Sequence, residues 1–333
     1  MVIPSQNPSP TQQLSAQSKA LVGAGGLALA ATAFPSASSL QASDTLLFAH
    51  GFGQTRGAWQ RSGMALAAEG YAGLSYDARG HGESARNPVD LPYTGEQFAD
   101  DLIIVAGEQT QPPVLVGASM GGLFGMIAEA RWPGLFRAMV LVDITPRWEE
   151  AGLQRILGFI TAFPQGFDSL DHAADIIAAY LPHRRARKSP EELREILRES
   201  DDGRWLWHWD ARLVDDLVRD CAQHQDDIAE AARALRCPVL LISGGRSDLV
   251  SAKTVEEFQA LVPHAQHAHL PQATHMLAGD DNDTFTATVL EYLAGLPAAT
   301  RASVDIGSTS QHPAPGESVA ATPITKPVSG ASP

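Results

Sequence analysis

The sequence predicts an α/β fold built on a mostly parallel sheet, and three observations indicate it. Short apolar strands alternate with helical stretches along most of the 333 residues. The motif Gly117-Ala118-Ser119-Met120-Gly121 directly follows one of these strands. Strand signals stop between Pro146 and about Arg236, where a helical insertion is expected. Alternation of this kind specifies parallel strands that are covered by helices on both faces. Functional residues are then expected at the carboxyl ends of the strands.

The chain opens with a predicted β-hairpin. The apolar run 21–34 is divided by Gly25-Gly26, and Leu27, Leu29, Ala31 and Ala33 then alternate at the period of a strand. A secretory signal peptide is the alternative, but Lys19 is the one basic residue before the run. The hairpin is favoured, so a cytoplasmic protein is expected, with secretion as the less favoured outcome. Further strands are predicted at 45–49, 72–77, 113–118, 138–143, 238–243 and about 266–270, and helices near 57–69, 94–108, 121–131, 253–261 and 283–295.

Ser119 is the predicted nucleophile. A strand that ends at a serine and turns sharply into a helix presents the hydroxyl above the sheet edge, in a strained turn. Gly117 and Gly121 remove side chains that would clash where the strand and the helix crowd together. The amides at the start of the following helix favour negative charge developing near the serine.

A serine nucleophile needs a base and an orienting acid. In a nucleophile-elbow fold they follow in the order serine, acid, histidine. Asp248 lies just past the strand at 238–243, and His275 follows the strand near 266–270, so both are predicted members of a catalytic triad. Asp143, which ends the strand at 138–143, is the alternative acid and is otherwise expected to bond to loop amides at the rim.

Two backbone amides are predicted to receive the oxyanion of an acyl-transfer reaction. One belongs to Met120, the residue after the nucleophile, and the other to Phe52, in the loop His50-Gly51-Phe52-Gly53 after an early strand. His50 is expected to brace this loop and not to act as a second base.

These motifs, together with Asp77-Ala78-Arg79-Gly80-His81-Gly82-Glu83-Ser84, resemble the α/β-hydrolase superfamily over about residues 19–296. The resemblance implies an eight-stranded sheet with a helical cap after the sixth strand. It also implies a structural role for Asp77, Arg79 and His81. A serine at position 119 is unlike the haloalkane dehalogenase and epoxide hydrolase branches, which use aspartate there. The resemblance covers esterases, C–C bond hydrolases and cofactor-free haloperoxidases, so it does not define the substrate.

The expected organisation is a disordered tail at 1–16, a hydrolase core at 17–145 and 237–298, a helical cap at 146–236 and a second disordered tail at 299–333. Cap helices are predicted over 153–163, 170–180, 190–198 and 211–224. Trp205, Trp207 and Trp209 alternate inside the cap. They are candidates for a substrate pocket, or else anchors of the cap on the core.

Charge and composition argue against several classes of binding partner. The net charge of −14 disfavours nucleic acid or an anionic membrane surface as a partner. No apolar run reaches the length of a membrane span. His264, His267 and His269 form a weak metal motif that lacks a further ligand, and no phosphate-binding loop is recognisable, so no metal or cofactor is expected. The oligomeric state is not defined by the sequence.

The sequence thus predicts hydrolysis of a small-molecule carboxylic ester, or a related acyl bond, through an acyl-enzyme intermediate. Two alternatives remain at this point. The same triad serves a C–C bond hydrolase or a cofactor-free perhydrolase, and the same scaffold serves a non-catalytic small-molecule receptor.

Overall fold

A computed structural model describes residues 14–37, 44–180, 187–275 and 282–297. The chain divides into a unit of residues 1–300 and a short unit of residues 301–333, and the second lies outside the described residues. The predicted tail at 299–333 also lies outside them, as does the tail at 1–16 apart from residues 14–16.

The described residues form an eight-stranded sheet with strand order β1-β2-β4-β3-β5-β6-β9-β10. Its strands are β1 (Gln17–Val22), β2 (Ala28–Phe34), β3 (Thr45–Ala49), β4 (Ala72–Tyr76), β5 (Val114–Ala118), β6 (Ala138–Val142), β9 (Val239–Arg246) and β10 (Gln266–Thr274). The pairs β1–β2 and β2–β4 are antiparallel, and all other neighbours are parallel. The predicted opening hairpin is confirmed, and it extends one edge of the sheet.

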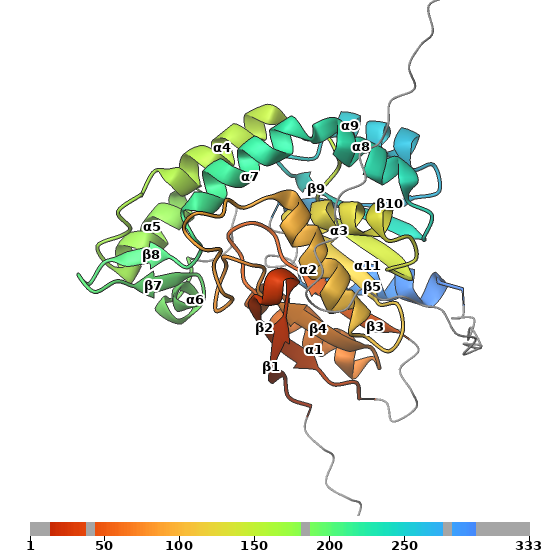
Figure 1. The fold of residues 1–333 in the computed structure, drawn as a ribbon, viewed down its shortest axis with the longest axis horizontal. Coiled ribbons are helices and arrows are strands. Elements are labelled where there is room, and N and C mark those ends of the chain that lie inside the picture. The colour runs from red at the N-terminus through yellow and green to blue at the C-terminus, as the bar shows by residue number, and fades with distance from the viewer. Residues whose placement is uncertain (1–13, 38–43, 181–186, 276–281, 298–333) are drawn as a thin grey trace, which may run out of the picture. The chain divides into compact units, whose positions relative to one another are not determined.

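Helices cover both faces of this sheet (Figure 1). One face carries α2 (Gly95–Gly107), α3 (Met120–Arg131), α8 (Gln225–Ala234) and α9 (Ala252–Leu261), which pack in this order. The other face carries α1 (Gln60–Ala68) and α11 (Asn282–Gly295), which pack together. Two short 3-10 helices, η1 (Ala24–Gly26) and η2 (Arg56–Trp59), complete this part of the fold.

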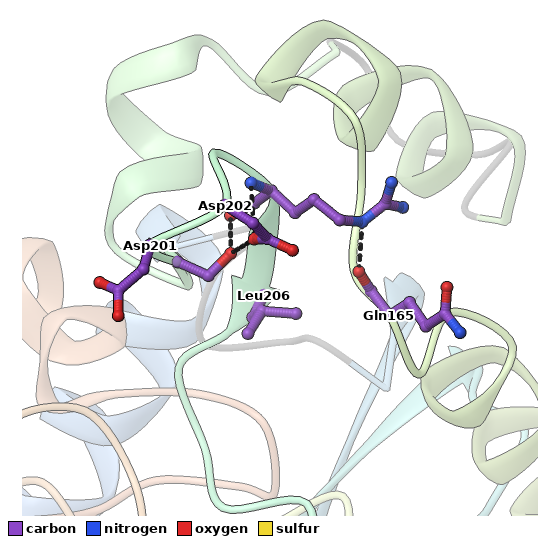
Figure 2. Close-up of a pocket in the computed structure, with 6 residues that line it drawn as sticks. Gln165, Asp201, Asp202 and Leu206 are labelled. Atoms are coloured by element: carbon purple, nitrogen blue, oxygen red, sulfur yellow. Dashed lines mark hydrogen bonds between the residues drawn. The ribbon is translucent and has the colours of Figure 1, made fainter.

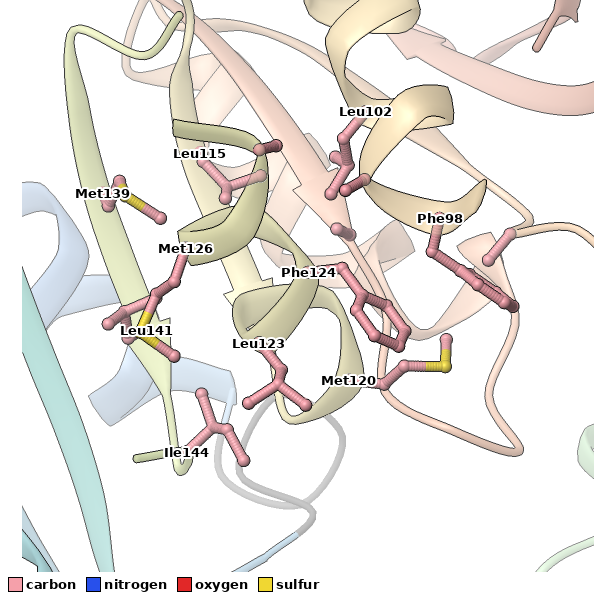
Figure 3. Close-up of a cluster of buried hydrophobic side chains, with 14 of the residues drawn as sticks. Phe98, Leu102, Leu115, Met120, Leu123, Phe124, Met126, Met139, Leu141 and Ile144 are labelled. Atoms are coloured by element: carbon pink, nitrogen blue, oxygen red, sulfur yellow. The ribbon is translucent and has the colours of Figure 1, made fainter. Parts of the chain in front are cut away.

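Two hydrophobic cores explain why the central strands are apolar throughout. Along β5, Leu115 packs into the core beneath α3, whereas Val114 and Val116 pack into the core on the opposite face. A strand buried on both faces has no polar side, so its sequence shows a continuous apolar run. Figure 3 shows the α3 side, where Met126 lies beside Met139 and Leu141 of β6 and Phe124 stacks on Phe98 of α2.

An insertion of residues 146–224, referred to below as the insertion, separates β6 from β9. It contains α4 (Glu150–Thr161), α5 (Leu170–Tyr180), α6 (Pro190–Arg194), β7 (Leu197–Glu199), β8 (Trp205–Trp207) and α7 (Arg212–Gln223). It contacts loops at the carboxyl edge of the sheet: the Asp210 amide donates to the Gly80 carbonyl at 2.8 Å, after β4. Its own small core includes Phe167, Ala173 and Leu193.

Two features of this region differ from the sequence-based expectation. The helix predicted over 190–198 ends at Arg194, and Leu197 then pairs with Trp207 in a two-stranded antiparallel sheet. These three-residue strands are stabilised by side-chain packing around Phe167, which a local pattern does not reveal. In addition, α8, which the sequence places within the cap at 146–236, packs against α3 over the main sheet.

Candidate active site

Ser119 occupies a strained turn between β5 and α3. Its backbone has φ 45° and ψ −114°, a conformation that L-residues seldom adopt. The turn is crowded, because a Cβ atom at Gly121 would lie 2.4 Å from the Ala49 carbonyl oxygen. A Cβ atom at Gly117 would lie 2.7 Å from the Cα atom of Gly122. Glycine at both positions is what permits the turn.

Asp143 lies directly beside this turn. The Ser119 amide donates to the carbonyl of Val142 at 3.0 Å, and Asp143 is the next residue along the chain. Asp143 has φ 50°, and with Ser119 it forms the complete set of non-glycine residues with positive φ among those the structure describes. Strain of this kind concentrates at functional sites, where the surroundings enforce it.

The carboxylate of Asp143 is fully buried and holds His275. His275 Nδ1 lies 2.7 Å from Asp143 Oδ2. The Gly244 amide donates to Oδ1 at 2.9 Å, and the Ser247 hydroxyl donates to Oδ2. A carboxylate at Nδ1 accepts a hydrogen bond from that nitrogen, so in the neutral His275 ring Nε2 is the nitrogen without a proton.

Asp248, the acid that the sequence favoured, lies elsewhere. Its carboxylate forms an ion pair with Arg155 of α4. The backbone of the Asp248 loop also packs tightly on that helix, because a Cβ atom at Gly152 would lie 1.9 Å from the Asp248 carbonyl oxygen. The structure therefore places Asp143, the alternative acid, against His275, whereas Asp248 joins the insertion to the loop after β9.

The turn after β9 explains why Asp143, and not Asp248, contacts His275. Ser247 precedes Asp248, and its hydroxyl accepts from the amides of Leu249 at 3.1 Å and Val250 at 3.0 Å while donating to Asp143. This turn directs Ser247 towards the buried carboxylate and leaves Asp248 outside it. The sequence signal that could have shown this is the position of Asp143, which follows β6 as directly as Ser119 follows β5.

The loop that was predicted to supply an oxyanion donor lies beside Ser119. A Cβ atom at Gly51 would be 3.3 Å from the Cβ atom of Ser119. In the part of the chain that the structure describes, the amides of Phe52 and Met120 donate no backbone hydrogen bond. Met120 opens α3, and amides in the first turn of a helix lack partners within it.

His50 braces this loop, as the sequence predicted. It is buried, with Nδ1 2.8 Å from the Gly51 carbonyl and Nε2 accepting from the Ala78 amide at 2.9 Å. Burial lowers the pKa of His50, so its ring is neutral near pH 7. A ring with both nitrogens engaged in this way is not available as a second base.

The three candidate pocket tryptophans occupy different positions. Trp209 packs against Phe52, with ring centroids 5.5 Å apart, and a Cβ atom at Gly53 would lie 3.1 Å from its ring. Trp207 stacks on Trp209 at 4.6 Å. Trp205 instead exchanges backbone hydrogen bonds with Phe167 and lies under the guanidinium of Arg194. Trp205 therefore contacts residues of the insertion itself.

A surface hollow of about 460 Å³ lies in the insertion and is lined by Gln165 and residues between 200 and 206 (Figure 2). Several of its polar groups are paired within the insertion. Arg204 donates to the carbonyl of Gln165 at 2.5 Å and to Asp168 at 2.6 Å, and Ser200 donates to Asp202 at 2.5 Å. The residues that line it do not include Ser119, Asp143 or His275.

The weak metal motif resolves into a local hydrogen-bond cluster. The hydroxyl of Ser243 lies 2.8 Å from His267 Nε2 and 3.2 Å from His269 Nδ1, while His264 Nε2 lies 3.0 Å from the Cys237 carbonyl. The described residues contain no cluster of three or more potential metal ligands from histidine, cysteine, aspartate and glutamate. Within the same described ranges, no helix combines the length and apolarity that a bilayer crossing requires.

Comparison with known proteins identifies the family of the chain. A family model described as serine aminopeptidase, S33, matches residues 41–282, most of the chain. The chain belongs to this family of α/β-hydrolases. It is a hydrolase enzyme with the α/β-hydrolase fold.

Individual relatives support this assignment. The chain is 29% identical to the esterase Rv0045c of Mycobacterium tuberculosis, over 71% of this chain and 78% of the relative. It is 31% identical to the sn-1-specific diacylglycerol lipase ABHD11 of Mus musculus, over 66% of this chain and 71% of the relative. The fold is similar to that of E-2-(acetamidomethylene)succinate hydrolase, with a TM-score of 0.72 at 22% identity, over 84% of this chain and all of that one.

Proposed function

We propose that this hydrolase cleaves a small-molecule carboxylic ester with Ser119 as nucleophile, His275 as base and Asp143 as orienting acid. The observation that carries the proposal is the buried Asp143 carboxylate at 2.7 Å from His275 Nδ1, beside the strained Ser119 turn. The names of two relatives, an esterase and a diacylglycerol lipase, describe ester-cleaving enzymes and support the same reaction type.

The reaction begins when Nε2 of His275 removes the Ser119 proton as the hydroxyl oxygen attacks the ester carbonyl. Asp143 fixes the imidazole tautomer and stabilises the imidazolium that forms. The amides of Phe52 and Met120 receive the oxyanion. The imidazolium then protonates the leaving alcohol, and an acyl-enzyme remains. Water, activated by His275, attacks the acyl carbon and releases the carboxylic acid and free Ser119.

In this proposal the insertion acts as a cap, and its aromatic side chains define the substrate class. From Phe52 a row of rings runs through Trp209, Trp207, Phe159 and Tyr180, with successive ring centroids 5.5, 4.6, 6.1 and 3.9 Å apart. Rings at this spacing form a continuous apolar stack that begins at the loop 50–53. An ester with an aromatic or medium-length acyl group suits such a stack better than a charged one.

The test combines one substitution with a substrate panel. Ser119→Ala should lower kcat for a p-nitrophenyl ester by about 10⁴-fold or more, because the residual rate comes from binding and the oxyanion hole alone. A fluorophosphonate probe should label the wild-type protein at residue 119 and leave the variant unlabelled. The kcat/KM values of aryl esters of increasing acyl length then show which acyl length the enzyme prefers. A substrate for C–C bond hydrolysis, assayed in parallel, tests the alternative chemistry. Unchanged ester turnover in a folded Ser119→Ala protein would refute the proposal.

A further inference from the structure

The insertion places a buried histidine, His208, against the oxyanion loop. His208 lies between β8 and α7 and is 6% exposed. Its Nδ1 accepts the Gly82 amide at 2.8 Å, and its Nε2 lies 3.2 Å from the Gly53 carbonyl. A backbone amide can only donate and a carbonyl can only accept. His208 is therefore the neutral tautomer with its proton on Nε2, and that proton is donated to Gly53.

The two carbonyl groups on either side of Phe52 are thus each held by an imidazole. Gly51 O lies 2.8 Å from His50 Nδ1, and His50 comes from the core. Gly53 O accepts from His208, which comes from the insertion. The turn between them is closed by the Gln54 amide, which donates to Gly51 O at 3.1 Å. With both flanking carbonyls and the turn fixed, the Phe52 amide has little freedom to rotate.

Side-chain packing supports the same arrangement. Gly53 has φ 74° and lies against the ring of Trp209, the residue after His208. The ring of Phe52 packs between His81, at 5.5 Å between centroids, and Trp209, also at 5.5 Å. Burial lowers the pKa of His208 to about 4, which keeps the ring in its neutral, bridging form near pH 7.

We propose that His208 is a positioning residue of the oxyanion hole, through which the insertion holds the Phe52 amide in its receiving orientation. This inference rests on the proposed ester hydrolase function and adds a residue to it. Its physical basis is that an oxyanion donor stabilises the transition state only when it is fixed in advance at the developing charge. Loss of His208 should therefore lower kcat while KM changes little, since ground-state contacts remain.

Replacing His208 by asparagine or by glutamine tests its two hydrogen bonds one at a time. The nitrogen of Gln reaches about as far as Nε2 of histidine, so His208→Gln retains a donor for the Gly53 carbonyl. Asn reaches only to the position of Nδ1, so His208→Asn retains a partner for Gly82 and loses Gly53. We expect His208→Asn to lower kcat by about 10- to 100-fold, which is less than the roughly 10²- to 10³-fold cost of removing an oxyanion donor, because the Phe52 amide is displaced but not removed. His208→Gln should recover most of that loss.

A second measurement excludes a general effect on the fold. A trifluoromethyl ketone forms a tetrahedral adduct with a serine nucleophile, whereas the matching methyl ketone reports ground-state binding. His208→Asn should weaken the first inhibitor by a factor similar to the fall in kcat and leave the second nearly unchanged. His172→Phe, at another histidine of the insertion, is the matched control and should leave both affinities at the wild-type level.

The outcomes distinguish this inference from the proposed function. If the wild-type protein hydrolyses esters in a Ser119-dependent way and folded His208→Asn matches it in kcat and trifluoromethyl ketone affinity, the positioning role is refuted alone. Equal losses in the Asn and Gln variants would also overturn it, because then the Gly53 bond is not what matters. If ester turnover is absent or independent of Ser119, the proposed function itself fails.

Discussion

Asp143 and Asp248 are the two candidates for the orienting acid, and they differ in burial and in hydrogen bonding. Asp143 and Asp248 both follow strands at the carboxyl edge of the sheet, but only Asp143 is fully buried with three donors directed at its oxygens. The Asp248 side chain is 28% exposed and pairs with Arg155, which is 60% exposed. An ion pair so open to water contributes at most about 1 kcal/mol to stability.

We therefore expect opposite results from one isosteric substitution at the two sites. Asp143→Asn should lower kcat for an aryl ester by about 10³- to 10⁴-fold, because the amide no longer fixes the His275 tautomer. Asp248→Asn should keep kcat within about threefold of the wild-type value and lower the free energy of unfolding by less than about 1 kcal/mol. Steady-state kinetics and urea unfolding measure both effects. A larger kcat loss at Asp248 than at Asp143 would show that Asp248 is the orienting acid.

The crowded serine turn allows a matched pair of glycine substitutions. Gly121→Ala would bring a methyl group to 2.4 Å from the Ala49 carbonyl oxygen, so β3 and α3 must separate. We expect it to lower the free energy of unfolding by about 3 kcal/mol. At Gly158, within α4, a Cβ atom meets nothing within 4 Å. Gly158→Ala should therefore stabilise the protein by about 0.5–1 kcal/mol. Urea unfolding measures both variants. Equal changes in the free energy of unfolding would show that the turn at Gly121 is not crowded.

At the scale of elements, the insertion is fastened to the core by a helix-to-helix cap. The Gly95 amide, the first of α2, donates to Asp220 of α7 at 2.8 Å, and the Tyr93 amide donates to Asp216 at 3.0 Å. A carboxylate at a helix N-terminus satisfies an amide that has no partner within the helix and interacts favourably with the helix dipole. Here that carboxylate comes from a residue 125 positions away.

This contact predicts a stability effect confined to one face of α7. Asp220→Ala should lower the free energy of unfolding by about 1 kcal/mol, the usual cost of losing an N-terminal cap. Asp215→Ala, on the exposed face of the same helix, should change it by less than about 0.5 kcal/mol. Thermal unfolding followed by circular dichroism compares them. If the two variants unfold at the same temperature, α7 does not cap α2.

The elements themselves could largely be predicted from the sequence, for a physical reason. Strands such as β3 and β5 are buried on both faces, so their apolar runs are visible without tertiary information. The position of Ser119 follows from the same logic, because it lies just past β5, whereas His275 follows β10, most of whose residues are exposed. The β7–β8 pair could not be predicted, since its short strands depend on packing against Phe167. Nor could the aspartate that contacts His275, because that contact depends on where the turn at Ser247 directs its neighbours.

At the scale of the whole molecule, three buried histidines tie the core to the insertion. His50, His81 and His208 lie side by side, with centroids 5.1 Å and 6.0 Å apart along the row. Burial lowers the pKa of all three, most strongly at His81. Asp77 favours protonation of His50 and His208, whereas Arg56 opposes it at His50 and Arg86 opposes it at His208; burial outweighs each of these charges.

These depressed pKa values make stability depend on pH with a definite sign. Between pH 6.5, where an unfolded histidine titrates, and about 4, where folded His208 does, the unfolded chain binds a proton that the folded one does not. The histidine contribution is thus complete above pH 6.5 and is lost as the pH falls below it.

We expect His208 alone to lower the free energy of unfolding by about 2 kcal/mol between pH 7.5 and 5.0, since each pKa unit is worth about 1.4 kcal/mol. Buried Asp101 and Glu129, whose pKa values burial raises, act in the opposite direction as the pH falls. They are common to the wild-type protein and to His208→Gln, so the difference between the two proteins isolates the histidine. Urea unfolding at both pH values should therefore show a smaller acid loss in His208→Gln, by about that amount. Parallel pH profiles for the two proteins would mean that His208 is already protonated in the folded state at pH 5, which is incompatible with an Nδ1 atom that accepts the Gly82 amide.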